Sequence, residues 1–189
     1  FVSDRLGDPT PRMSGRLTLN PLKHLDPIGT LCLLFFHMGW ANPVPINPYY
    51  YKDRKKGIIL VSLAGPAVNL LLAFVSLLIE GLLMLYGSSS SSIVQTAMSL
   101  AYYSAVLNIG LGIFNLIPVP PLDGSHILGY FTSSKVDAFF YKNQRMISIV
   151  FMVILVTGVL SGPIGFVEQH IYNLLLTLTN WIPNLLGTL

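Results

Sequence analysis

The chain has 189 residues, of which 52% are hydrophobic and only 10% are charged, whereas about a quarter of the residues of a soluble domain are charged. Lys and Arg outnumber Asp and Glu by eleven to eight, but no Lys or Arg occurs between Lys56 and Lys135 or after Arg145. Such long gaps exclude a nucleic-acid-binding domain, in which basic residues cluster on one face of a soluble fold. The composition predicts an all-α polytopic membrane protein.

The start of the chain carries no recognisable leader. Residue 1 is Phe, and the residues after it lack the charged and apolar regions of a signal peptide. We therefore expect Phe1 to be an internal position of a longer polypeptide. The single cysteine, Cys32, cannot form an internal disulfide and is expected to be a buried small hydrophobic residue.

Residues 9–56 mix Pro, Gly, Asn and aromatic residues with short apolar runs. Residues 16–19 alternate polar and apolar side chains, and the prolines of residues 44–48 favour extended backbone, so both segments are predicted to be short β-strands or extended loops. Proline is tolerated mainly at a sheet edge, where an unwound peptide could add as a further strand. The apolar run 28–38 is too short to cross a membrane and is predicted to be re-entrant or interfacial.

Three apolar runs are predicted to cross the membrane as helices, for which about 20 residues are needed. They cover residues 57–79, 93–117 and 146–160. Residues 164–186 are a weaker fourth candidate that either spans the membrane or lies in the interface, because Glu168 and other polar residues lie near its start. The predicted fold class therefore has three to four transmembrane helices, with a re-entrant or interfacial segment and short β-strands near the N-terminus.

Two loops beside the predicted spans are rich in Lys and Arg, namely residues 52–56 and 135–145. Short loops of this kind face the cytoplasm according to the positive-inside rule, so both are predicted to be cytoplasmic. The uncharged serine run 88–92 joins the first two spans and is predicted to be a flexible linker on the opposite side.

The second predicted span ends in a cluster of prolines that is followed by Asp123 and Gly124. An ionisable residue at such a place is costly unless it is paired or bound to a metal, which makes Asp123 a candidate functional residue. An ordinary polar turn at the membrane surface is the alternative, since Asp-Gly after prolines is a common turn sequence. The four histidines show no metal-binding spacing, so the chain holds no complete zinc site; they are His24, His37, His126 and His170.

Several motifs resemble, in the same order, those of the site-2 protease family, which are intramembrane zinc metalloproteases. Residues 115–124 resemble its N-x-x-P-x-P-x-L-D-G signature, and residues 64–69 resemble its A-G-P-x-x-N motif. Further stretches resemble the segment that bacterial members carry after the catalytic helix, namely residues 6–10, 15–21, 24–30 and 39–45. The resemblance implies a membrane core over residues 1–145, followed by C-terminal transmembrane or interfacial helices over residues 146–189.

The resemblance implies one Zn²⁺ held by Asp123 and by the two histidines of an H-E-x-x-H helix, with the glutamate of that helix as general base. The sequence contains no H-E-x-x-H, so these residues are expected upstream of Phe1. We expect this chain alone to bind zinc poorly and to cleave nothing. The parent would be an intramembrane metalloprotease of a bacterial cell membrane that hydrolyses transmembrane protein substrates.

The same resemblance assigns substrate-binding roles to Asn42, Pro43 and Asn69. The amide of Asn69 could hold the substrate backbone or the oxyanion, or could instead make an interhelical hydrogen bond. Asn42 and Pro43 would lie near a substrate-binding edge, or could form a structural loop. Gly110 and Gly112 are expected to allow close helix approach.

Two other classes of protein remain compatible with these residues. A catalytically inactive membrane homologue would bind client transmembrane helices without cutting them. A transporter-like bundle would be expected to carry inverted repeats, and the predicted spans show no internal similarity. The sequence indicates neither the oligomeric state nor the identity of the substrate.

Overall fold

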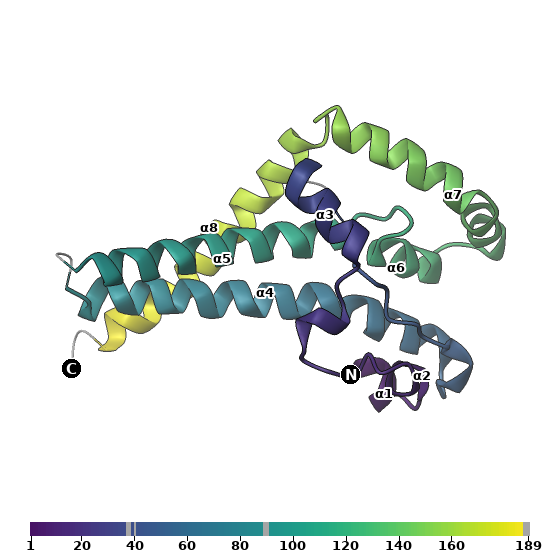
Figure 1. The fold of residues 1–189 in the computed structure, drawn as a ribbon, viewed down its shortest axis with the longest axis horizontal. Coiled ribbons are helices and arrows are strands. Elements are labelled where there is room, and N and C mark those ends of the chain that lie inside the picture. The colour runs from purple at the N-terminus through teal and green to yellow at the C-terminus, as the bar shows by residue number, and fades with distance from the viewer. Residues whose placement is uncertain (37–38, 40, 89–90, 187–189) are drawn as a thin grey trace. The chain divides into compact units, whose positions relative to one another are not determined.

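The structure, a computed structural model, describes residues 1–36, 39, 41–88 and 91–186 (Figure 1). It divides into two compact units, Phe1–Val61 and Ser62–Leu189, and the predicted division at residue 145 stays a prediction. The helices are α1 Val2–Arg5, α2 Thr10–Met13, η1 Pro21–Lys23, α3 Pro27–Phe36, η2 Pro48–Tyr50, α4 Arg54–Tyr86, α5 Ser92–Leu116, α6 Asp123–Phe131, α7 Ser134–Val156 and α8 Ser161–Leu186.

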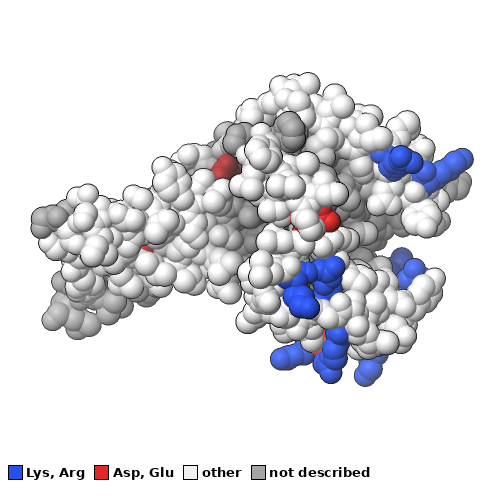
Figure 2. Space-filling model, viewed as in Figure 1, with Lys and Arg blue, Asp and Glu red and all other residues white. Residues whose placement is uncertain are grey.

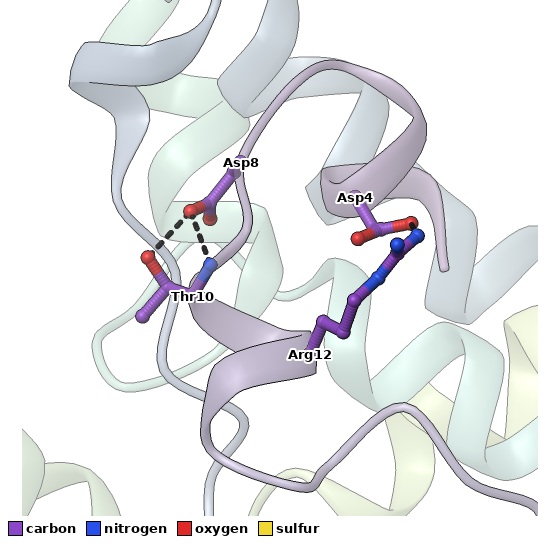
Figure 3. Close-up of polar contacts among 4 residues, drawn as sticks. All are labelled: Asp4, Asp8, Thr10 and Arg12. Carbon is purple, nitrogen blue, oxygen red and sulfur yellow. Dashed lines mark hydrogen bonds and ion pairs between the residues drawn. The ribbon is translucent and has the colours of Figure 1, made fainter.

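The first unit is organised around the buried carboxylate of Asp8, which is 0% exposed. Its oxygens accept hydrogen bonds from the Oγ of Ser3 at 2.8 Å, from the amide and hydroxyl of Thr10 at 2.9 and 2.5 Å, and from the amide of Asn47 at 2.8 Å. Figure 3 shows the two bonds from Thr10. Asp8 thereby joins α1, the start of α2 and the residue before η2.

These hydrogen bonds also set the charge state of Asp8. Burial alone would raise the pKa of this carboxyl, but the bonds from Thr10, Asn47 and Ser3 together bring its pKa below the ordinary value of 3.8. A lowered pKa in the folded chain means that the ionised carboxylate stabilises the fold. This stabilisation is complete above the pKa of an unfolded aspartate and is lost as the pH falls through the lower pKa of the folded chain.

We expect Asp8→Asn to destabilise the first unit by about 2 kcal/mol at neutral pH, because hydrogen bonds to a charged acceptor are lost. The loss of stability that the native unit shows below about pH 4 should be flattened in this variant. Hydrogen exchange of the amides in residues 1–61, followed from pH 7 to pH 3, would measure both effects.

Asp4→Asn is the matched control for this prediction, since Asp4 lies in the same unit (Figure 3) and pairs at 2.6 Å with Arg12, whose side chain is 69% exposed. An exposed ion pair contributes less than about 1 kcal/mol. Equal losses in the two variants would contradict the central role of Asp8.

The β-strands predicted at residues 16–19 and 44–48 are not confirmed. Both segments are irregular, and η2 begins at Pro48. In the part of the chain that the structure describes, the only strand-like pairing is an isolated antiparallel bridge between Leu25 and Ala41. Prolines at positions 43, 45 and 48 remove the amide donors that a longer ladder would need.

The short apolar run predicted at residues 28–38 forms α3, Pro27–Phe36, while residues 37 and 38 lie outside the described residues. Ten helical residues extend about 15 Å, half of a hydrocarbon core of about 30 Å. The helix is therefore too short to cross a membrane, as predicted, and whether it is re-entrant or interfacial stays a prediction.

Within the described residues, three helices are long and apolar enough to cross a membrane: Arg54–Tyr86, Ser92–Leu116 and Ala138–Val156. They confirm the three predicted spans, although the third begins eight residues earlier than the predicted residue 146. The weaker fourth candidate forms α8 but is not among these three. Most of the large apolar side chains of the three candidate spans are exposed, as lipid-facing residues must be. Figure 2 shows almost no charge on the halves of α4 and α5 that lie next to the loop joining them.

In the second unit, α5 contacts both α4 and α8. Small residues bring α4 and α5 together, since a Cβ at Gly112 would lie 3.5 Å from the carbonyl oxygen of Pro66 and 3.6 Å from the Cβ of Asn69. A hydrogen bond of 2.9 Å joins the hydroxyls of Ser76 and Ser104 across the same interface. The buried residues of these two helices include Ala73, Leu77, Ala105 and Ile109. Such close packing by small residues is typical of membrane helices.

The distances at Gly112 predict that the effect of a substitution on stability depends on the size of the new side chain. Gly112→Ala should be tolerated or should stabilise the helix by about 0.5–1 kcal/mol, because its methyl group would meet only ordinary contacts. Gly112→Leu should cost about 2 kcal/mol, because the larger side chain would push α4 and α5 apart. Thermal unfolding in detergent measures both, and equal effects of the two variants would show that this contact does not hold the helices together.

Candidate functional site

The candidate site begins where α5 ends. Prolines at positions 118, 120 and 121 cannot continue a helix, and α6 starts immediately after them at Asp123. The intervening turn is closed by hydrogen bonds from the amide of Leu122 to the carbonyl of Val119 at 2.9 Å and from the amide of Ser125 to the carbonyl of Leu122 at 3.1 Å. Asp123 is thus the first residue of a helix, where the helix dipole favours a negative charge.

Gly124 allows α6 to start directly against the end of α5. A Cβ at this position would lie 2.2 Å from the carbonyl oxygen of Leu116 and 2.4 Å from that of Ile117, distances that real Cβ atoms essentially never show. Only glycine fits here without a shift of the backbone. The glycine of the L-D-G motif therefore fixes the place of the neighbouring carboxylate.

The Asp123 carboxylate faces α4 at the glycine of the A-G-P-x-x-N motif. One of its oxygens, Oδ2, lies 3.4 Å from the position that a Cβ would take at Gly65. Because Gly65 has no side chain, nothing from this position covers the carboxylate. The fold therefore brings together two motifs that lie far apart in the sequence.

The electrostatic setting of Asp123 is mixed. The residue is half-buried, and burial raises the pKa of its carboxyl, while the charge of His126 acts in the opposite direction. His126 is exposed and lies three residues further along α6. A carboxylate in such surroundings gains from a cation beside it.

The carboxylate of Asp123 fits as one ligand of a zinc ion but does not complete a site. Zinc in an enzyme takes three protein ligands and keeps a further position open. In the described part of the chain no group of three or more His, Cys, Asp or Glu residues could hold a metal ion. A complete centre would need donors that these residues do not supply.

The predicted site residues occupy different places. Asn69 lies on α4 one turn after Gly65, with its Cβ directed towards Gly112 of α5. Asn42 belongs to the first unit, where its amide donates to the carbonyl of His24 at 2.8 Å and its side chain donates to the carbonyl of Leu25 at 2.9 Å. These contacts close a loop, and Pro43 follows it as an exposed residue. Substrate-binding roles for these residues stay predictions.

None of the other histidines belongs to a described group of three or more residues that could hold a metal ion. A ring nitrogen of His24 lies 3.1 Å from the carbonyl oxygen of Thr18, and a ring nitrogen of His170 lies 2.8 Å from that of Phe166. His37 lies outside the described residues. Local backbone contacts therefore account for the two rings that the structure places.

Sequence reasoning missed two residues of α7, one that contacts the proline turn and one that contacts α5. The hydroxyl of Ser148, on α7, donates to the carbonyl of Pro120 at 3.1 Å. Phe151, one turn further on, packs its ring against Phe114 of α5 with the centroids 6.1 Å apart. Neither residue belongs to a motif or shows a pattern that would have marked it.

Comparisons with known proteins agree with these motifs. The sequence profile of peptidase family M50 matches residues 78–159. The chain is 39% identical over 158 residues to the candidate zinc metalloprotease YwhC of Bacillus subtilis, an alignment that covers 83% of this chain and 72% of YwhC. No solved structure matches the chain.

Two other relatives align over smaller shares of their own lengths. Rip2 of Mycolicibacterium smegmatis, a candidate zinc metalloprotease, is 29% identical over 167 residues, which are 85% of this chain and 61% of Rip2. The zinc metalloprotease MJ0392 of Methanocaldococcus jannaschii is 31% identical over 118 residues, which are 57% of this chain and 32% of MJ0392. With its three helices able to cross a membrane, the chain is therefore an integral membrane protein of peptidase family M50, the family of the site-2 proteases.

Proposed function

We propose that this chain forms part of an intramembrane zinc metalloprotease in which Asp123 is one of three protein ligands of the metal. The observation that carries the proposal is the meeting of two motifs, since Asp123 at the start of α6 faces the bare backbone of Gly65 on α4. The names of the relatives support the zinc and the protease activity.

The proposal requires an H-E-x-x-H helix that the 189 residues do not contain. Its two histidines would complete the zinc ligands and its glutamate would be the general base. Without them, this chain should bind zinc poorly and cleave nothing. Residues 1–145 would carry the protease core, and residues 146–189 would add C-terminal helices.

In the proposed reaction, the metal and three positions of the chain would have separate roles. Bound zinc would activate a water molecule and polarise the scissile carbonyl. Asp123 would contribute a negative charge held by the N-terminus of α6, and the glycine at position 65 would leave room beside that charge. The side chain of Asn69, on the same face of α4, would hold the substrate backbone or the oxyanion.

A helical substrate must unwind before its backbone can be cut. Residues 43–46, which follow Asn42, are irregular and have no ladder partner in the described chain. Their backbone could pair with an unwound segment of a transmembrane protein, although the prolines at positions 43 and 45 limit the donors. This is the substrate-binding role proposed for Asn42 and Pro43.

Two basic segments predict how the chain is oriented in the membrane. Residues 52–56 include the start of α4, and residues 135–145 lie in the first half of α7. Both basic segments would face the cytoplasm of a bacterial cell. The proline turn and Asp123 would then lie on the cytoplasmic side as well. Substrates cut there would be transmembrane proteins.

The decisive experiment compares this chain with a longer protein that adds an H-E-x-x-H helix at its N-terminus. Zinc stoichiometry and cleavage of a model transmembrane substrate are measured for both. We expect about one zinc and cleavage only for the longer protein. Cleavage by the short chain would refute the ligand assignment, while failure of both would favour an inactive homologue that binds client helices.

A further inference from the structure

A shallow, open groove of about 940 Å³ lies along one face of α7, and the described residues that line it all belong to this helix. Its lining side chains recur at helical spacing, with Tyr141, Arg145 and Ser148 in the first half and Ile149, Met152 and Val153 in the second. Of the eight described residues that line the groove, seven are exposed and Ser148 is partly buried. This groove plays no part in the zinc site described above.

The lining is polar at one end and apolar at the other. Lys142 and Arg145 lie in the first half, and none of the described residues that line the groove is acidic. Met152 and Val153 lie in the second half, about 12 Å further along the helix axis from Arg145 at 1.5 Å per residue. An occupant that fits this pattern has an anionic head and an apolar tail.

Neither cation of the groove is neutralised by a described partner. The ion pairs among the described side chains join Asp4 to Arg12 and Asp53 to Lys56, and neither involves α7. Figure 2 shows a group of Lys and Arg side chains over α7, next to a surface without charge. Among the described side chains, no ion pair offsets the positive charges of Lys142 and Arg145.

The position of the groove in the membrane points to the same occupant. Lys142 and Arg145 lie in the first eight residues of the candidate span Ala138–Val156, from which their long side chains would reach the lipid headgroups. Tyr141, which is 85% exposed, suits the same interfacial layer. Ile149, Met152 and Val153 then lie deeper, where acyl chains are found.

We propose that this groove binds an anionic phospholipid. Its phosphodiester lies between Lys142 and Arg145, and an acyl chain runs along Ile149, Met152 and Val153. Basic pockets at the cytoplasmic ends of membrane helices bind anionic headgroups in this way. A soluble phosphate would use only the charged half of the groove and would leave the apolar half in contact with other lipids.

The test uses the complete chain in detergent, titrated with phosphatidylglycerol and followed by native mass spectrometry. K142Q/R145Q should bind the lipid about 30-fold more weakly, the loss expected for two charges near a membrane surface. K55Q/K56Q removes the same charge from the start of α4 and serves as the control, with less than about a twofold change expected from diffuse attraction. K142R/R145K, which keeps both charges, should bind like the native chain.

Further arms distinguish the sources of the anion and the role of the tail. Inorganic phosphate at the same concentration should not displace the lipid, and M152S/V153S should weaken lipid binding at unchanged charge. Equal losses in K142Q/R145Q and K55Q/K56Q, or full displacement by phosphate, would overturn the proposal. The experiment measures only lipid binding, so its result does not depend on whether the protein is a protease.

Discussion

Replacing Asp123 by Asn, in a protein that also carries the H-E-x-x-H helix, is expected to abolish zinc-dependent cleavage. An amide is a neutral and weaker ligand than a carboxylate, and the half-buried carboxylate is the only proposed metal ligand in this chain. Zinc affinity should fall by more than about 100-fold, because even partners that merely orient a ligand are worth 10–100-fold. Metal analysis after dialysis against a graded chelator would measure the affinity, and cleavage of a transmembrane substrate would measure activity.

Asp53→Asn is the control for this variant. Asp53 is an exposed carboxylate just before α4, and it pairs with Lys56 at 3.6 Å on the surface. Its loss should leave zinc content and cleavage unchanged. Retention of one tightly bound zinc by Asp123→Asn would show that the carboxylate does not bind the metal, and Asp123 would then be an ordinary residue of a turn.

The membrane helices were predictable because apolar runs of the required length leave few alternatives. The bounds of the third span were not, since Lys142 and Arg145 lie inside α7 while the predicted run began only at residue 146. Long basic side chains can reach the interface from within a helix, so hydropathy alone places the start of such a helix too late. Because the predicted span began too late, the charged half of the groove was assigned to a loop, and the groove itself was not predicted.

The predicted N-terminal strands, which are not confirmed, rested on a weak local pattern. Four alternating residues at 16–19 give a weak signal, and the prolines of 44–48 favour extended backbone without supplying donors for a ladder. The unit is instead held by the carboxylate of Asp8, which collects hydrogen bonds from Ser3, Thr10 and Asn47. Contacts across almost forty positions leave no periodicity in the sequence, so such a cluster appears only in the structure.

The sequence motifs named the candidate site residues, but they did not predict how those residues are arranged in space. The motif resemblance singled out Asp123 and Asn69, but it did not say that the carboxylate faces Gly65 or that the Cβ of Asn69 points towards Gly112. Those relations depend on how α4, α5 and α6 pack. The structural task of Gly124 was equally hidden, because a glycine after an aspartate is as common in turns as at helix contacts.

Gly124→Ala should therefore have a large effect for a purely steric reason. The added methyl group would lie 2.2 to 2.5 Å from the backbone of Leu116 and Ile117, which cannot rotate away as a side chain could. Overpacking of this kind costs about 3 kcal/mol, and the small gain in helix propensity of about 1 kcal/mol does not offset it. Thermal unfolding in detergent should show the loss in the present chain without any metal.

The matched control is Gly165→Ala in α8, where nothing lies within 4 Å of the added methyl group. The same change of residue in a helix should be neutral there or slightly stabilising. In a protein with the H-E-x-x-H helix, Gly124→Ala should also weaken zinc binding, because moving α6 to relieve the clash would displace Asp123, the residue next to position 124. A variant at position 124 as stable as the one at position 165 would mean that α6 tolerates a larger separation from α5, and the carboxylate would then not be fixed by this contact.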